Sequence, residues 1–308
     1  MTSSTTSAAT AAPRITRETL GYIFGFLGVL IFSFTFPFTR IAVRELNPTF
    51  VGLGRALIAA TLSGGLLIVT RQPLPTRRQF GRLLIVALGV VVGFPLFSAW
   101  ASRFVNASHS AIVNALLPLA TAVLGAIVSG DRPSRRFWIA AIIGSLTVIA
   151  YILITSRQAI EIGDLAMLGA VALASIGYVS GGRMSAEIGS WQTICWANSV
   201  AAPFLLIPVA LTAPDNAASI STPAWLAFGY LGVFSMFLGF FAWHRGLAIG
   251  GITRVSQVQL IQTFLTITWS WLILSETITP LMLAAATIVV VMIFIARRAP
   301  IRKNTSTP

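Results

Sequence analysis

Ten long intervals without a charged residue constrain the fold of this chain more than any other feature of its sequence. A helix that crosses a bilayer needs about 20 mostly apolar residues, and each interval has room for one. The intervals are 19–39, 46–70, 83–102, 104–130, 137–156, 165–182, 188–214, 216–244, 255–275 and 277–296, with Arg55 as the one interruption. The sequence therefore predicts an all-α membrane protein with ten transmembrane helices.

The composition supports this class. Only 9% of the 308 residues are charged and 56% are hydrophobic, whereas roughly 25% of the residues are charged in soluble globular domains. The expected helices cover about Leu20–Phe38, Pro48–Val69, Leu83–Ser102, Ser108–Gly130, Phe137–Ile154, Leu165–Gly182, Trp191–Leu211, Trp225–Trp243, Val255–Leu274 and Pro280–Ala296. The single cysteine, Cys195, excludes a disulfide within the chain.

The positive charges are unevenly divided between alternate connections. With ten spans and a cytoplasmic N-terminus, sixteen of the 21 lysines and arginines fall on the cytoplasmic side. The remaining five are Arg40, Arg44, Arg103 and Arg157 outside and Arg55 within a span. Because an excess of lysine and arginine marks cytoplasmic connections, we expect both chain ends in the cytoplasm. The net charge of +13 then needs no nucleic-acid partner.

Two apolar stretches, Ser108–Arg136 and Gln257–Ile278, resemble each other at a separation of about 145 residues. Their overlay pairs Asn114 with Gln259, Pro118 with Thr263, Thr121 with Thr266 and Asp131 with Glu276. Each half of the chain then holds five spans, an odd number, so the second half enters the membrane the other way up. The sequence predicts an inverted repeat, which makes two packings, one open to each side, close in energy.

The expected organisation has five parts. They are a disordered cytoplasmic tail over 1–18, a first five-helix repeat over 19–157, a linker over 158–163, an inverted five-helix repeat over 164–298 and a basic cytoplasmic tail over 299–308.

The ten spans, the two halves and the recurring ending Gly130-Asp131 and Ser275-Glu276 resemble the EamA-type transporters of the drug/metabolite transporter superfamily. The resemblance covers about residues 20–298 and is greatest to the aromatic amino-acid exporters. It implies a secondary transporter in the cytoplasmic (inner) membrane that exports or equilibrates small metabolites, chiefly aromatic and other apolar amino acids. Thr263 departs from the family pattern, because a proline is common at that position.

A row of polar residues follows one face of the ninth span. Its members are Ser256, Gln259, Thr263, Thr266 and Ser270, at steps of 3, 4, 3 and 4, which place them on one side of a helix. The fourth span carries a thinner row with Asn114, and Pro118 frees the Asn114 carbonyl because proline lacks an N–H. We expect Asn114, Pro118, Gln259, Gln262, Thr263 and Thr266 to line a substrate pathway. The alternative is that they only join helices through hydrogen bonds worth roughly 1 kcal/mol each.

Four aromatic residues, Trp100, Tyr178, Trp243 and Trp269, are candidates for the walls of the pathway. Their rings suit an apolar or aromatic substrate and attract an ammonium group through cation–π contact. The alternative is the interfacial belt, where Trp and Tyr are enriched.

Three titratable residues lie within or beside spans. Arg55 either has a structural role, reaching outward or pairing with Glu45 or Glu276, or holds a substrate carboxylate. His109 and His244 are expected at the ends of the fourth and eighth spans. Both histidines are expected to be exposed there, although either one titrates near neutral pH if it serves a transport role.

The eight acidic residues all fall in tails, loops or helix ends. This disfavours a proton-coupled multidrug exporter built on a membrane glutamate. The sequence has no Walker motif, no metal-ligand cluster and no Ser–His pair placed for acyl transfer, so we expect no enzyme, metal or cofactor. The expected partners are a small-molecule substrate and the lipid bilayer, with the protein a monomer or weak oligomer. The alternatives are a multidrug, nucleotide-sugar or other metabolite carrier and, more remotely, a membrane enzyme.

Overall fold

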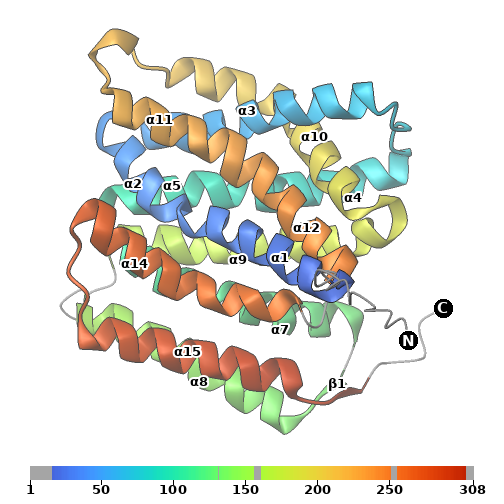
Figure 1. The fold of residues 1–308 in the computed structure, drawn as a ribbon, viewed down its shortest axis with the longest axis vertical. Helices are drawn as coiled ribbons and strands as arrows, with labels where there is room; N and C mark the ends of the chain where they lie inside the picture. The colour runs from blue at the N-terminus through green and yellow to red at the C-terminus, as the bar shows by residue number, and fades with distance from the viewer. Residues whose placement is uncertain (1–15, 131, 156–160, 251–254, 303–308) are drawn as a thin grey trace, which may run out of the picture.

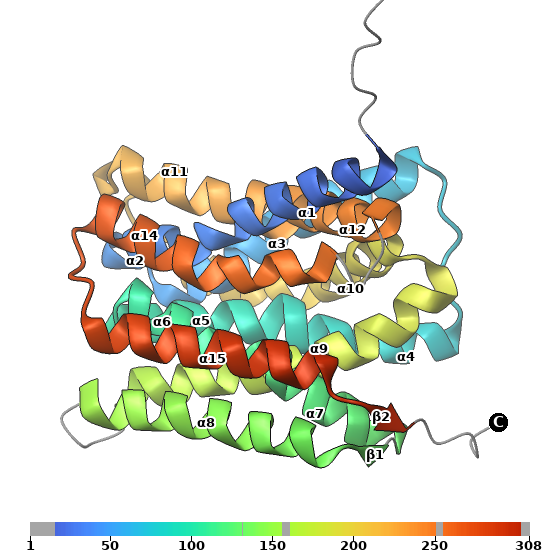
Figure 2. The same ribbon diagram turned by 60° about the horizontal axis from the view of Figure 1, so that its bottom comes forward.

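The structure, a computed structural model, describes residues 16–130, 132–155, 161–250 and 255–302. Within these ranges nine helical runs are long and apolar enough to cross a membrane, and a tenth apolar helix, Val258–Leu274, is shorter. All ten lie where the sequence predicted spans, and they run side by side in one bundle (Figures 1 and 2). Residues 1–15 of the expected N-terminal tail, 158–160 of the expected linker and 303–308 of the expected C-terminal tail lie outside the described residues. The described ends of the tail and linker are already helical, because α1 begins at Arg17 and α9 at Ile162.

The first half of the chain contains the following elements. They are α1 (Arg17–Ser33), α2 (Thr35–Glu45), α3 (Pro48–Val69), α4 (Arg77–Val86), the π-helix η1 (Ala87–Gly93), α5 (Phe94–Phe104), α6 (Ala107–Asn114), α7 (Leu117–Ser129), β1 (Arg132–Pro133) and α8 (Arg135–Thr155).

The second half follows the same order of long helices. Its elements are α9 (Ile162–Ile188), α10 (Ser190–Leu211), the 3₁₀-helix η2 (Ala217–Ser219), α11 (Thr222–Tyr230), the π-helix η3 (Leu231–Leu238), α12 (Gly239–Gly250), the 3₁₀-helix η4 (Ser256–Ile261), α14 (Gln262–Leu274), α15 (Pro280–Arg298) and β2 (Ile301–Arg302).

Prolines account for the breaks in two spans of the first half. A proline cannot donate to the carbonyl four residues earlier, and its ring crowds that carbonyl. Pro37 follows the interruption at Phe34 between α1 and α2, and Pro118 follows the interruption between α6 and α7. In the second half Thr263 replaces the proline, and a 3₁₀ turn, η4, precedes α14 instead. The helix therefore changes its winding at the corresponding place without a proline.

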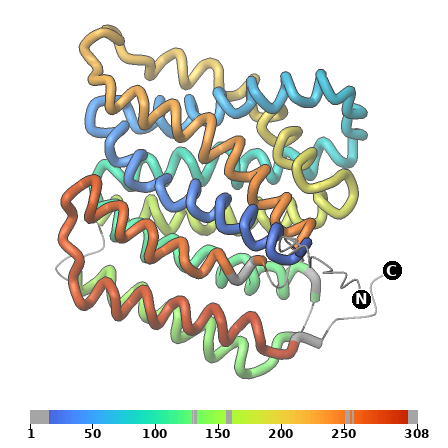
Figure 3. The backbone as a smooth tube through the Cα atoms, viewed as in Figure 1, coloured from blue at the N-terminus to red at the C-terminus, as the bar shows by residue number. Residues whose placement is uncertain are grey.

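Glycines allow α1 to approach α12 at backbone distance. A Cβ added to Gly21 would lie 2.3 Å from the Cα of Gly250, and one added to Gly246 would lie 2.4 Å from the nitrogen of Gly25. Such small residues let helices pack closely where lipid supplies no hydrophobic driving force. Figure 3 shows these two segments, far apart in the sequence, side by side along their length.

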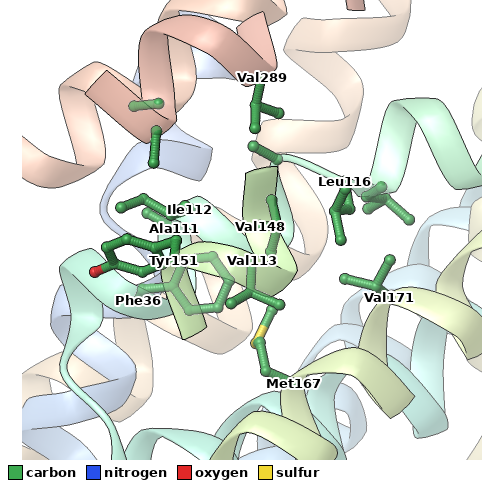
Figure 4. Packing of buried hydrophobic residues seen from close by; sticks show 14 of the residues in the cluster. Phe36, Ala111, Ile112, Val113, Leu116, Val148, Tyr151, Met167, Val171 and Val289 are labelled. Carbon is green, nitrogen blue, oxygen red and sulfur yellow. The ribbon is translucent and has the colours of Figure 1, made fainter. Parts of the chain in front are cut away.

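The largest buried apolar cluster fills the space between α2, α6, α8, α9 and α15. Figure 4 shows the Phe36 ring beside Tyr151, with Val148, Ile112 and Met167 completing the packing around them. All five side chains are at most 2% exposed. This cluster joins elements of both halves, so neither half has a separate core here.

The start of α1 and the end of α15 lie at the same end of the bundle, which we call the terminal end (Figures 1 and 2). The two-residue strands β1 and β2 pair antiparallel at this end, with Arg132 opposite Arg302 and Pro133 opposite Ile301. This short pairing is an addition to the predicted all-α fold. The other end, which we call the opposite end, carries the connections 46–47, 105–106 and 275–279.

Candidate functional site

A cavity of about 520 Å³ lies inside the bundle, between helices of the two halves. Eight of the predicted pathway residues line this cavity: Asn114, Pro118, Tyr178, Trp243, Gln259, Gln262, Thr263 and Thr266. Arg55 and His244 line it as well. Three members of the predicted polar row of the ninth span, Gln259, Thr263 and Thr266, thus meet the polar residues of the fourth span around one space. Ser270 does not line the cavity, and the side chain of Ser256 lies outside the described part of the chain.

The cavity reaches the surface at the terminal end. Its lining includes Ser185 near the end of α9, Ser190 at the start of α10 and Arg297 near the end of α15. None of the described residues in the opposite-end connections 46–47, 105–106 and 275–279 lines it. The described part of the chain therefore forms a pocket that is open at one end and closed at the other.

A network of hydrogen bonds closes the opposite end. The Glu276 carboxylate accepts from the backbone N–H groups of Ala107 and Ser108, at 2.8 and 2.9 Å, and from the Ser108 hydroxyl at 2.6 Å. It thereby satisfies the start of α6, whose first N–H groups have no partner within the helix. Arg103 donates to the carbonyl of Val43 at 2.9 Å, which ties α5 to α2.

A second layer of polar contacts forms the floor of the cavity. The Thr266 hydroxyl donates to the carbonyl of Ser33 at 2.9 Å. This carbonyl is free because Pro37, four residues later, has no N–H to offer it. The Trp269 indole N–H donates to the Ser33 hydroxyl at 2.9 Å, and Thr35 pairs with Ser235 at 2.8 Å. Thr266 thus lines the cavity, as expected of a pathway residue, and it also joins two helices through a hydrogen bond, as the alternative interpretation of the polar row expects.

Aromatic side chains make up much of the cavity wall. Phe32, Phe36, Phe94 and Phe240 line it together with Trp243. The rings of Phe32 and Phe240 meet edge to face, with centroids 5.1 Å apart, an arrangement that aromatic pairs prefer. The wall is suited to a flat apolar group.

Besides an atom of Arg55, two polar atoms of the wall have no hydrogen-bond partner among the described residues. The Oδ1 atom of Asn114 and the hydroxyl of Thr121 are buried without a hydrogen bond. A buried polar group left unsatisfied costs about 1–3 kcal/mol. Both residues line the cavity, so a ligand that donates hydrogen bonds there would remove this cost.

Arg55 is the most unusual residue of the lining. It is 1% exposed, so it does not reach outward as one alternative required. It donates to the hydroxyl of Ser98 at 3.0 Å and, at 3.5 Å, to that of Thr39, and its Nε has no partner. The expected pairing with Glu45 or Glu276 is wrong. Glu45 accepts from the backbone and hydroxyl of Ser221 instead, and Glu276 caps α6.

The expectation of an exposed His109 is also wrong. Its side chain is buried, and Nε2 lies 2.7 Å from Oδ1 of Asp164. Asp164 stands at a helix start, as the sequence indicated, but it is fully buried there. Nothing in the spacing of either residue signals the contact. His244, predicted at an exposed helix end, instead lines the cavity beside Phe240, with ring centroids 6.1 Å apart.

Two of the predicted aromatic residues lie away from the cavity. Trp100 donates to the hydroxyl of Thr49 at 3.1 Å and borders a separate small pocket at the opposite end. Trp269 stacks on Phe34 at a centroid distance of 4.6 Å, behind the floor. Sequence reasoning missed the floor hydroxyls Thr35 and Ser235. Thr35 and Thr39 are separated by one helical turn within an apolar span, which is the signal that could have identified this face.

Comparison with known proteins decides the family. The EamA-like transporter family matches the chain twice, over residues 19–154 and again over residues 161–298. The chain belongs to the EamA-like transporter family. It is therefore a multi-pass membrane transporter of the drug/metabolite transporter superfamily.

Two proteins of Bacillus subtilis (strain 168) match over most of the chain. The uncharacterized transporter YdeK is 42% identical over 282 residues, which are 92% of this chain and 98% of the relative. The uncharacterized transporter YyaM is 25% identical over 240 residues, 75% of this chain and 78% of the relative. Both names indicate transport and neither names a substrate.

A protein of known crystal structure shares the fold. It aligns with a TM-score of 0.63 at 16% identity, over 90% of this chain and 97% of that chain. Among the described residues of this EamA-like transporter, no group of three or more His, Cys, Asp or Glu is arranged to hold a metal ion.

Proposed function

We propose that this protein is a secondary transporter that moves aromatic and other apolar amino acids across the cytoplasmic membrane by alternating access. The observation that carries the proposal is the cavity between the two halves, open at the terminal end and closed at the opposite end, with aromatic and aliphatic walls and, among the described residues, a few unsatisfied polar atoms. Its volume of about 520 Å³ lies within the roughly 300–1,000 Å³ of small-molecule sites.

The wall chemistry supports an amphiphilic substrate. Phe32, Phe94 and Phe240 offer apolar faces to a side chain. The unpartnered Oδ1 of Asn114 is a hydrogen-bond acceptor and suits an ammonium group. A zwitterion with an apolar side chain matches both features.

Corresponding irregularities in the two halves support the inverted repeat. The third span contains the π-helix η1 and the eighth contains the π-helix η3. The fourth span ends at Gly130 with φ 67° and the ninth at Ser275 with φ 56°, each directly before the acid of the repeated ending. In an inverted repeat a pseudo-two-fold rotation axis in the membrane plane relates the two halves, so that each packing has a counterpart of the same handedness that is open to the other side.

The proposed topology sets the direction in which the cavity faces. With both ends of the chain in the cytoplasm, the terminal end is cytoplasmic and the structure is open inward. Trp100 follows η1 in the third span and Trp243 follows η3 in the eighth, so the proposed repeat makes the two residues approximate counterparts. Trp243 lies at the open end in the cavity, and Trp100 lies at the closed end outside it. We expect Trp100 to enter the pathway when the opposite end opens.

The experiment is counterflow in proteoliposomes. Vesicles loaded with unlabelled phenylalanine are diluted into a trace of labelled amino acid, for a panel that spans aromatic, aliphatic and charged side chains. We expect transient accumulation of the aromatic and apolar members, unchanged by a pH gradient. A released chemical product would indicate an enzyme, and absence of accumulation for every amino acid would reject the proposed substrate class. Gradient-dependent accumulation would contradict facilitated transport and direct attention to His109 and His244.

A further inference from the structure

We propose that Arg55 binds the carboxylate of the substrate at the floor of the cavity, so that the transported compounds are those that carry a carboxylate beside an apolar or aromatic group. This inference rests on the proposed transport function and narrows its substrate class. It assigns one end of the substrate to one side chain.

Arg55 lies at the closed end of the cavity. It follows the start of α3 by seven residues, which is roughly 10 Å from the opposite end at 1.5 Å per residue. Asn114 follows the start of α6 by the same number of residues. Both start at the opposite end, so the guanidinium and the unpartnered amide oxygen lie at a similar depth. Both residues line the cavity.

The hydroxyl groups around Arg55 orient the guanidinium without neutralising it. Ser98 accepts from Nη2 at 3.0 Å and itself donates to the carbonyl of Pro95. Thr39 accepts weakly from Nη1 at 3.5 Å and itself donates to the carbonyl of Thr35. The Nε–H group is buried and unbonded. A guanidinium has five N–H donors in a planar fork, so several remain for a ligand.

No acid of the described chain compensates this charge. Glu45 and Glu276 accept hydrogen bonds from Ser221 and Ser108, and Asp164 lies against His109. Glu187 pairs with Arg82. A buried charge without a compensating partner is costly, and the described acids leave Arg55 in that condition.

A carboxylate supplies what is missing. Arginine and carboxylate form two parallel charge-assisted hydrogen bonds, and this geometry distinguishes a carboxylate from a neutral amide. Phosphate would also bind an arginine, but the remainder of the cavity is mostly apolar, and Arg55 is its one cation away from the mouth among the described lining residues. An aromatic or aliphatic carboxylate therefore fits better than a phosphorylated compound.

The experiment measures the thermal stability of the purified full-length protein with four related probes. They are phenylalanine, 3-phenylpropanoate, phenylalaninamide and 2-phenylethylammonium. We expect the two carboxylates to raise the melting temperature of the wild type and the two compounds without a carboxylate to leave it unchanged. This comparison needs no substitution, so it holds even if variants fail to fold.

Variants then locate the effect. Arg55→Met and Arg55→Gln are expected to abolish the rise in melting temperature with both carboxylates. Arg55→Lys is expected to need at least tenfold more of either carboxylate to reach the same rise. Arg44→Gln, which removes an exposed arginine outside the cavity, is the matched control and is expected to respond as the wild type does. Without ligand, Arg55→Met is expected to melt at or above the wild-type temperature, because it removes an unpaired buried charge.

Two results of the melting experiment overturn the inference. One is equal stabilisation by phenylalaninamide and phenylalanine, and the other is a carboxylate response that persists in Arg55→Met. A lower melting temperature of ligand-free Arg55→Met, with an unchanged carboxylate response, assigns Arg55 a structural role.

Counterflow distinguishes failure of this inference from failure of the proposed transport function. If labelled phenylalanine exchanges equally well in Arg55→Gln, transport stands and the role of Arg55 falls. If no amino acid exchanges while 3-phenylpropanoate binding depends on Arg55, the amino-acid proposal falls and the carboxylate site stands.

Discussion

The Nε2 atom of His109 lies 2.7 Å from Oδ1 of Asp164, and both side chains are buried. The contact joins α6 in the first half of the chain to the start of α9 in the second half. Tyr151 lies beside the imidazole at a ring distance of 5.1 Å. The pair belongs to the same closed end as the Glu276 cap on α6, so separating the two halves at this end requires that both contacts break.

Asp164→Asn is expected to loosen the opposite end. The amide keeps the shape of the carboxylate but replaces a charge-assisted hydrogen bond with a neutral one, a loss of about 1–2 kcal/mol. Ser102→Cys reports opening, because Ser102 is fully buried beneath this end. In a Cys195→Ala background, its alkylation by an impermeant maleimide should accelerate several-fold. Glu187→Gln, at the exposed pair with Arg82, is the control, since exposed ion pairs contribute about 0–1 kcal/mol. Equal rates in Asp164→Asn and its parent would contradict the prediction.

Glu276→Gln is expected to open the same end by a different route. The carboxylate accepts three hydrogen bonds from Ala107 and Ser108 at the start of α6, and loss of such a helix cap costs about 0.5–2 kcal/mol. The Ser102→Cys reporter should again react faster, and the two substitutions together should add. Glu45→Gln, which disturbs the start of α11 through Ser221, tests whether capping in general has this effect. A larger response to Glu45→Gln than to Glu276→Gln would count against a specific role of the α6 cap.

Cysteines along the ninth span are expected to divide by face. Gln259→Cys and Gln262→Cys lie in the cavity lining and should react with an impermeant thiol reagent added at the terminal end. Ile261→Cys, on a half-exposed apolar position outside the lining, should face lipid and stay unreactive, and so should Ile267→Cys in the core. Alkylation is followed by mass shift in inside-out vesicles. Similar rates at positions 259 and 261 would disprove the predicted water-filled face.

Gly246→Ala is expected to destabilise the contact between α1 and α12. The new methyl group would lie 2.4 Å from the nitrogen of Gly25, and overpacking of this kind costs about 1–3 kcal/mol. Gly229→Ala is the matched control, because nothing lies within 4 Å of its added Cβ and alanine is favoured over glycine in a helix by about 0.5–1 kcal/mol. Melting of the purified variants should give a lower temperature for the first and an unchanged or higher one for the second. The reverse order would show that the close approach is not needed.

The positions of the ten apolar helices followed directly from the spacing of charges. The break between α6 and α7 also has a local cause, since Pro118 removes one backbone donor wherever the helix packs. The exception was the ninth helix. There Thr263 stands where a proline is common in the family, so no proline accounts for the 3₁₀ turn, η4, that precedes α14. Backbone winding in η4 therefore depends on packing against α1 as well as on local sequence.

The cavity lining was predictable in part. A polar row at helical spacing on an apolar span marks a face that avoids lipid, and Gln259, Thr263 and Thr266 do face the cavity. The same argument does not distinguish a cavity from a neighbouring helix, and Thr266 contacts both. Aromatic residues carry no such directional signal, because a tryptophan suits a wall, a core or an interface. Trp243 lines the cavity while Trp100 and Trp269 do not.

By itself the sequence determined the class of protein, the order and placement of its helices and the face of the ninth helix that avoids lipid, because each depends on residues close together in the chain. Tertiary structure alone decided which charges meet. Glu276 caps α6 across 168 residues, His109 contacts Asp164 across 55, and Arg55 has no acid as a partner among the residues that the structure describes. A side chain's partner depends on which helices pack together and in what register. In a low-dielectric interior that choice decides whether a charge is neutralised or remains available for a ligand.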